Sequence, residues 1–372
     1  MTEFLLKELT NSDIDWMIST GQQLDIDSNQ QLIEQGTINN NFFVLLEGGC
    51  ITTIASEGGN IMGRAFAALE NVASVDQKLE ELGIGAIFGE SAFLGVAKST
   101  VSVKATEKSR VLKLSHQALY ERMGQDTGFG ARFYHALALH ADERCQRIIP
   151  QYLSRKLGFV QSLMAGGSAF GELSDGDVDW LLKNGKVEVI PKGEVFIQAG
   201  RPVEFLFILL NSTCAVSAFD KPRKMSRIFA SLESGSQGED AIGSEIIHLN
   251  TGEITGETAF VSLNTISTVA VRTLQESVFL AVPCKVLQLE LQKNLGFASR
   301  FYRMLSMLLT SRGEALIERM GYGKRRSYDR NQPLQANVLY EDEIDDSSLD
   351  NLTLAGARFD WMLKRLSVRG NV

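Results

Sequence analysis

Residues 87–94 read IFGESAFL, and residues 254–261 read ITGETAFV. Each stretch places Gly-Glu directly after two residues typical of a strand, and a small residue, alanine and phenylalanine follow. A glycine lets the backbone approach a ligand closely, and a one-turn helix after it would aim free N–H groups at an anion. Because the pattern occurs twice, it also indicates an internal repeat.

The repeat extends outward from these motifs on both sides. Four more pairs of similar segments follow in the same order: 9–21 with 173–185, 31–48 with 195–212, 99–105 with 267–273, and 128–137 with 296–305. Their registers run from 164 to 168 residues apart and drift only where loops would absorb an insertion. Five matches in one order indicate a duplicated domain.

Each copy is predicted to begin with a short helix and to end with a long one. LTNSDIDWMISTG (9–21) and LSDGDVDWLLKNG (173–185) start with capping residues and stop at glycine, which marks a short helix. About eight short strands rich in Val, Ile, Phe and Leu, separated by glycine turns, favour a jelly roll. The long helix of each copy is amphipathic, with apolar faces formed by Phe129, Phe133, Leu137 and His140 in the first and by Phe297, Phe301, Leu305 and Leu308 in the second.

The predicted fold class is therefore mainly β with flanking helices. It consists of two tandem β-rolls, each followed by a long amphipathic helix, and a helix in the C-terminal tail. We expect a first domain at 1–147, a linker at 148–172, a second domain at 173–323, and an acidic tail at 324–372. A short helix is also expected around residues 76–82, inside the longer loop of the first copy.

The two Gly-Glu motifs and the order of elements resemble the phosphate-binding cassette of the cyclic-nucleotide-binding domain family. The resemblance covers nearly all of residues 9–147 and 173–320. It implies that Glu90 and Glu257 bind a ribose 2′-hydroxyl and that the backbone after Gly89 and Gly256 holds a cyclic phosphate. The candidate ligand-binding residues are Gly89, Glu90, Ser91, Ala92, Lys98, Ser99, Thr100, Gly256, Glu257, Thr258, Ala259, Ser267 and Thr268.

The sequence departs from the family at one important position. The arginine expected just before the return strand, which forms a fork on the phosphate, is replaced by Ser99 in the first copy and by Ser267 in the second. Losing such a pair weakens binding by about a hundredfold or more. A cyclic nucleotide, cAMP or cGMP, is therefore a candidate ligand for the first domain only, where Lys98 would act as a point charge; the second pocket is expected to be empty.

A simpler interpretation of the same residues stays open. A glutamate after glycine can merely cap a short helix at a corner of the roll, and Lys98 can be a solvated loop lysine. The aromatic residues of the long helices are then core or interface residues, and both pockets are dead.

Other functions find little support in the sequence. The histidines are scattered, the four cysteines form no CxxC pair, and no nucleophile triad, phosphate loop or HExxH motif occurs, so we expect no enzyme and no metal site. The formal net charge of −8 argues against nucleic-acid binding. No apolar run is long enough to span a bilayer and no secretory signal is present, which favours a cytoplasmic protein.

The tail suggests a role in protein contacts. Residues 349–368 predict an amphipathic helix, which would dock on a partner or pack back on its own domains. Together with the long helices, it makes a protein partner or a homodimer the expected mode of association.

FASRFY (297–302), MGYGK (320–324) and LAGARFDWMLKRL (354–366) are similar to cyanobacterial two-domain proteins associated with bacteriocin-type transport. This resemblance implies a non-enzymatic regulatory or adaptor protein, accessory to peptide export, with weakened or lost nucleotide binding. The alternative is a purely structural assembly module.

Overall fold

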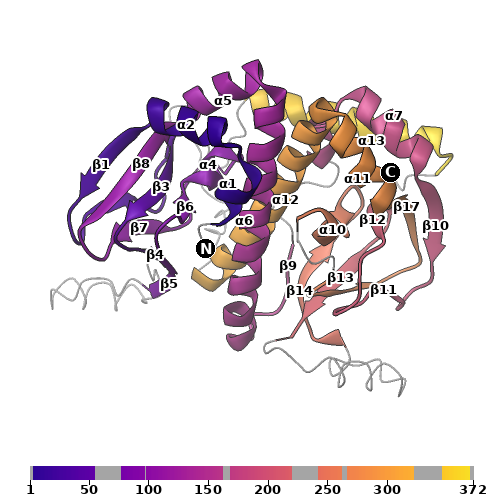
Figure 1. The fold of residues 1–372 in the computed structure, drawn as a ribbon. Helices are drawn as coiled ribbons and strands as arrows, with labels where there is room; N and C mark the ends of the chain where they lie inside the picture. The colour runs from indigo at the N-terminus through magenta and orange to yellow at the C-terminus, as the bar shows by residue number, and fades with distance from the viewer. Residues whose placement is uncertain are drawn as a thin grey trace, which may run out of the picture.

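A computed structural model describes residues 3–54, 77–96, 98–161, 168–219, 242–261, 266–321 and 346–368. Two sets of antiparallel sheets lie on either side of a central pair of long helices, α6 and α12 (Figure 1). The mixed content of helix and jelly-roll-like sheet agrees with the predicted fold class.

The first set contains two four-stranded sheets, in the orders β1-β8-β3-β6 and β2-β7-β4-β5. Its strands are β1 (Gln22–Ile26), β2 (Gln31–Ile33), β3 (Asn41–Glu47), β4 (Cys50–Ile54), β5 (Gln77–Leu82), β6 (Ile87–Phe88), β7 (Ser102–Ala105) and β8 (Ser109–Ser115). All of their pairings are antiparallel. Inward-facing residues such as Ile33, Leu45, Val103 and Val111 fill the space between the sheets and are buried.

The second set repeats this strand order, with each strand number raised by nine. Its strands are β10 (Lys186–Ile190), β11 (Val195–Ile197), β12 (Phe205–Asn211), β13 (Cys214–Ala218), β14 (Ser244–Leu249), β15 (Ile254–Thr255), β16 (Ala270–Thr273) and β17 (Ser277–Pro283). A two-residue strand, β9 (Val160–Gln161), is added in parallel at the edge beside β14.

The helices lie around and between the sheets (Figure 1). They are α1 (Glu3–Glu8), α2 (Asn11–Thr20), α4 (Glu90–Phe93), α5 (His116–Gln125), α6 (Thr127–Ser154), the 3-10 helix η1 (Ser168–Gly171), α7 (Asp175–Asn184), α10 (Thr258–Val261), α11 (Cys284–Lys293), α12 (Leu295–Gly321) and α13 (Asp346–Arg365).

The short helices α2 and α7 confirm the interpretation of residues 9–21 and 173–185. Each begins with a capping box, formed by Thr10 with Asp13 and by Ser174 with Asp177. Each ends at a glycine whose φ is negative. Here the glycine is required by close packing: a Cβ on Gly21 would lie 2.5 Å from the side chain of Leu112.

The long helices pack against each other along the middle of the molecule (Figure 1). Their predicted apolar faces are buried, and Phe129, Phe133, Phe297 and Phe301 are each at most 1% exposed. Phe129 and Phe133 pack against Trp16 and Phe42, and Phe297 and Phe301 pack against Trp180 and Phe260, so each apolar face is covered by elements of its own half of the chain.

The structure differs from two local predictions. Residues 77–82 form strand β5 instead of a short helix, because they pair in antiparallel fashion with β4. In the segment predicted as a linker, 148–172, α6 continues to Ser154 and residues 160–161 pair with β14. Of the small-residue stretch 165–171, only 168–171 is described, as η1.

The tail helix α13 packs on η1 and α7. Phe359 contacts Phe170 with ring centroids 5.6 Å apart, and Arg358 Nε lies 2.8 Å from Asp175 Oδ1. Ala355 and Met362 are fully buried. The predicted amphipathic helix therefore docks on its own chain.

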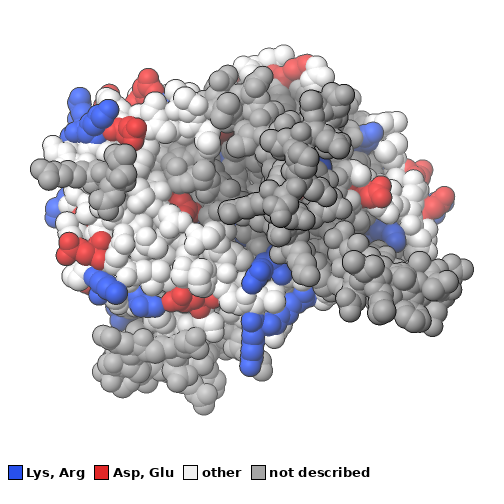
Figure 2. All heavy atoms as spheres, turned by 180° about the vertical axis from the view of Figure 1, so that it is seen from behind, with Lys and Arg blue, Asp and Glu red and all other residues white. Residues whose placement is uncertain are grey.

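On the face shown in Figure 2, acidic and basic side chains occur together over much of the described surface. Across the described ranges, no helix combines the length and apolar character needed to cross a bilayer.

Candidate functional site

Each predicted cassette begins with a glycine that no other residue could replace without strain. Gly89 precedes α4 with φ +87°, and Gly256 precedes α10 with φ +91°. A Cβ on Gly89 would lie 2.4 Å from the carbonyl oxygen of Asn41, and one on Gly256 would lie 2.4 Å from that of Phe205. Both glycines are therefore needed for a left-handed backbone and for close contact with β3 and β12.

Glu90, the first residue of α4, is buried and faces α6. Its Oε1 lies 3.6 Å from His140 Nε2 and 3.5 Å from Arg144 Nη1. Burial by itself would raise the pKa of this carboxyl, but His140 and Arg144 outweigh it and lower the pKa of Glu90 to about 2. Glu90 is thus an anion that already has partners inside the protein.

The hydroxyls of the first cassette bind a carboxylate from the second half of the chain, which is the half that contains the second set of sheets and α12. Ser91 Oγ donates to Glu314 Oε1 at 2.8 Å, and Thr100 Oγ1 donates to Glu314 Oε2. Arg144 Nη1 donates to Glu314 Oε1 at 2.8 Å. Glu314 lies on α12, and its side chain is 1% exposed.

Arg144 connects this carboxylate to two others. In addition to Glu314 and Glu90, its Nε lies 3.5 Å from Glu80 Oε2 on β5. Burial opposes the charge on Arg144, but the surrounding carboxylates outweigh it and raise the pKa of the guanidinium above its ordinary value. Arg147, one turn further along α6, also binds Glu80, with Nε 2.9 Å from Oε1. The first cassette is therefore part of a buried network of acids and arginines.

The second cassette uses an arginine from its own long helix. Arg312 Nη1 donates to Glu257 Oε1 at 2.6 Å, and Nη2 donates to the carbonyl oxygen of Ile254 at 2.6 Å. Glu257 Oε2 and Arg312 Nε are buried and have no hydrogen-bond partner among the described residues. Such groups leave hydrogen-bonding capacity for a water or for a polar ligand atom.

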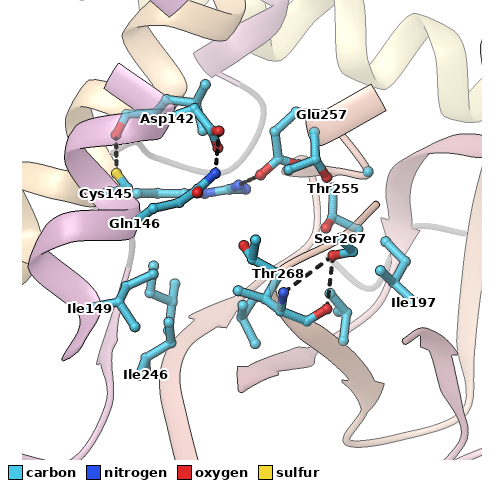
Figure 3. A pocket seen from close by; sticks show the side chains of 18 of the residues that line it. Asp142, Cys145, Gln146, Ile149, Ile197, Ile246, Thr255, Glu257, Ser267 and Thr268 are labelled. Carbon is cyan, nitrogen blue, oxygen red and sulfur yellow. Dashed lines mark hydrogen bonds and ion pairs between the residues drawn. The ribbon is translucent and has the colours of Figure 1, made fainter. Parts of the chain in front are cut away.

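A cavity of about 60 Å³ adjoins this pair (Figure 3). Asp142, Cys145, Gln146 and Ile149 reach it from α6, and residues of the second roll and of α12 line the rest. The predicted residues Gly256, Glu257, Thr258, Ser267 and Thr268 all lie on its wall. A nucleotide-sized ligand needs a pocket of about 300 Å³ or more, so this cavity must widen before it could hold one.

Asp142 places a second acid in the cavity wall. It is 8% exposed, and its Oδ2 accepts a hydrogen bond from Gln146 Nε2 at 2.6 Å. Burial and the nearby charge of Glu257 raise the pKa of Asp142 to about 7. The helix of the first half therefore contributes a group to the second pocket that titrates near neutral pH.

The structure brings some of the predicted site residues together and leaves others apart. Ser91 and Thr100 meet at one carboxylate, whereas the side chain of Lys98 is exposed. The backbone N–H of Ser99 donates a hydrogen bond to Thr37 O at 2.9 Å. Ser267 Oγ donates to Val269 O at 2.8 Å. Ala92 lies in α4, and Ala259 is buried in α10.

Sequence reasoning missed the arginines that face the cassettes. The sequence pattern predicted a cation just before the return strand, whereas Arg144 and Arg312 come from the long helices. Both stand at equivalent positions of the repeat, in the register that aligns Phe129 with Phe297. That shared position was a signal present in the sequence.

Glu314 had no such signal, because the aligned residue of the first copy is Gln146. Within the described ranges, no group of three or more His, Cys, Asp or Glu side chains is arranged to hold a metal ion.

The fold and the cassettes can be compared with known proteins. A search of curated proteins returns no match. Among solved structures, the regulatory domain of Toxoplasma gondii PKA with cAMP is 12% identical, with 80% of this chain and 89% of that chain covered and a TM-score of 0.28. The Thermus thermophilus catabolite activator protein is 16% identical, with 51% and 75% covered and a TM-score of 0.33.

The family model described as "cyclic nucleotide-binding domain" matches residues 24–126. The match runs from β1 through the cassette at Gly89–Phe93 to the end of α5. Residues 24–126 of this chain are therefore similar to the cyclic nucleotide-binding domain.

Proposed function

We propose that this chain is a non-enzymatic regulatory or adaptor protein of the cytoplasm that carries two cyclic-nucleotide-binding-type domains, at 1–147 and 173–323. The segment 148–172 joins them, and 324–372 is a tail. The matching strand orders of the two halves and the equivalent glycines at 89 and 256 support a second domain of the same type.

The observation that carries this proposal is the placement of one arginine beside the acid of each cassette. Arg144 on α6 lies beside Glu90, and Arg312 on α12 binds Glu257. The two helices pack against each other, so a ligand that replaces either pairing alters the contact between the halves. A pocket coupled in this way to a helix interface suits a sensor that passes its state to a partner protein.

We further propose that cyclic nucleotides, cAMP or cGMP, bind weakly or not at all. Serines occupy the positions of the missing arginine, and the Glu90 carboxylate already pairs with His140 and Arg144. The cavity of about 60 Å³ beside Glu257 points in the same direction. Binding then requires a rearrangement whose cost lowers the affinity.

A role beside a peptide export system is the finer part of the proposal. It rests on the resemblance of 297–302, 320–324 and 354–366 to two-domain proteins associated with bacteriocin-type transport. Of these segments, 322–324 lie outside the described residues. The exposed side chains of Leu354 and Trp361 on α13 offer apolar contacts for a partner protein.

A second candidate function is a purely structural assembly module with both pockets dead. The small cavity and the internal pairing of both cassette acids favour it. In this case the rolls act only as surfaces on either side of the helix pair.

Titration calorimetry with cAMP, cGMP and linear dinucleotides distinguishes the two functions. A sensor is expected to give weak, saturable binding to one of them, and Glu90→Gln is expected to lower that affinity at least tenfold. Glu107→Gln removes an exposed carboxylate from the same roll and is the matched control. No binding of any of these ligands, up to millimolar concentration, would favour the structural module.

A further inference from the structure

Glu314 belongs to the second half of the chain and is bound by the cassette of the first. Ser91 is 223 positions away from it in sequence, and Thr100 is 214 positions away. Both hydroxyls donate to its carboxylate, one to each oxygen. With a side chain that is 1% exposed, Glu314 makes these contacts in a site closed to solvent.

The groups that hold Glu314 are of the kinds that bind an anion. Ser91 lies on the one-turn helix after Gly89, and Thr100 precedes strand β7. Arg144 adds a positive charge, with Nη1 2.8 Å from the carboxylate and 3.5 Å from Ser91 Oγ. Two hydroxyl donors and a guanidinium suit any small oxyanion, a carboxylate or a phosphate alike.

We propose that Glu314 is a built-in occupant of the first cassette, which keeps this site closed until an external phosphate-type anion displaces it. The inference rests on the proposed function, because that function assigns the cassette to an anionic ligand. It adds the regulation of the site: the second half of the chain controls access to the first pocket through α12.

The remaining carboxylates explain how an exchange could occur. When Glu314 leaves, Arg144 keeps Glu80 and Glu90 within 3.5 Å, so the guanidinium does not lose all of its partners. The departing Glu314 carboxylate must reach water or another donor, which requires α12 to move relative to the first roll. Anion binding and separation of the helix from the roll are therefore linked.

The second half lacks this arrangement. The residue aligned with Glu314 is Gln146, a neutral amide that donates to Asp142 at 2.6 Å. An occupant of the same charge is thus absent from that position of the repeat. The closure is specific to the first cassette.

Removing the charge of Glu314 tests the closure. Glu314→Gln keeps the shape of the side chain, and Glu318→Gln, at an exposed position one turn further along α12, is the matched control. Calorimetry with cAMP and with pyrophosphate is expected to show at least tenfold tighter binding to Glu314→Gln than to the wild type or to Glu318→Gln. Equal affinities in a wild type that does bind would overturn the inference and leave the proposed function intact.

A double-mutant cycle provides a readout that needs no ligand. Thr100→Val removes the hydroxyl that donates to Glu314, and melting temperatures are measured for both single variants and for the double variant. If Glu314 occupies the site, the double variant is expected to lose at least about 3 °C less than the sum of the single losses. If no variant binds either probe, both the proposed ligand binding and the displacement of Glu314 by an anion fail; additivity in the cycle overturns the occupancy of the site by Glu314 whatever the probes do.

Discussion

Asp142→Asn is expected to stabilise the protein at neutral and alkaline pH. Asp142 is 8% exposed, and burial beside Glu257 raises its pKa from 3.8 to about 7. Because the folded state holds this proton more tightly than the unfolded state, the wild type loses stability as the pH rises from about 4 to about 7. Asparagine carries no charge at any pH and escapes this loss.

The size of the effect follows from the difference in proton affinity. Each tenfold change in proton affinity corresponds to about 1.4 kcal/mol. The rise of the Asp142 pKa from 3.8 to about 7 therefore sets an upper limit of roughly 4 kcal/mol on the stability that the wild type loses. Relaxation of the cavity and entry of water reduce this value. We expect the free energy of unfolding of Asp142→Asn to exceed that of the wild type by about 2 to 4 kcal/mol at pH 8 and to equal it near pH 4.

Urea denaturation between pH 4 and pH 8.5 measures this difference. Asp15→Asn makes the same chemical change at an exposed position of α2 and should give a constant difference near zero. A free-energy difference between Asp142→Asn and wild type that does not change with pH would refute the reasoning. So would a variant that is less stable throughout, because the carbonyl oxygen of asparagine can still accept the hydrogen bond from Gln146.

Three further substitutions test the packing of the second half of the chain. Gly256→Ala should lower the free energy of unfolding by about 2 kcal/mol or more, because φ is +91° and the new Cβ would lie 2.4 Å from Phe205 O; an unchanged calorimetric melting temperature would contradict this. Arg300→Ala removes the ion pair in which Arg300 Nε lies 2.6 Å from Asp177 Oδ2. It should lower the free energy of unfolding by about 1 to 2 kcal/mol at pH 7, a modest value because the Arg300 side chain is 40% exposed. Burial opposes the charge of Asp177, but Arg300 outweighs it and lowers the pKa of that carboxyl, so this difference should vanish in urea titrations as the pH falls below about 4; a pH-independent difference would argue against the ion pair. Phe359→Ala should release α13 from its own chain, at a cost of about 3 kcal/mol, and make the tail more sensitive to limited proteolysis; equal cleavage rates would show that the aromatic contact does not hold the helix.

The sequence predicts the local features of this fold well because they depend on neighbouring residues. The capping boxes of α2 and α7, the apolar faces of α6 and α12, and the amphipathic tail helix all follow from short-range patterns. Residues 77–82 show the limit of such patterns. QKLEEL has a composition suited to a helix, but pairing with β4 makes it a strand, and that partner lies beyond a long insertion.

The candidate site was predictable only in part, for a related reason. The glycines and acids of the cassettes are contiguous in sequence, whereas Arg144 follows Glu90 at a distance that only the folded long helix explains. Glu314 lies further still from the hydroxyls that it binds. Its position depends on how α6 and α12 pack, which no local pattern encodes.

The packing of the two long helices also makes two similar cassettes chemically different. In the exchange that we propose, an anion that enters the first displaces the carboxylate of Glu314, which Ser91 and Arg144 hold there. An anion that enters the second meets no such occupant. It would face Arg312, which attracts it, and Asp142 and Glu257, which repel it less when Asp142 is protonated. Occupancy of the first pocket should therefore depend on the helix contact and that of the second on pH, since in each roll it is the helix of the other half that supplies the deciding acid.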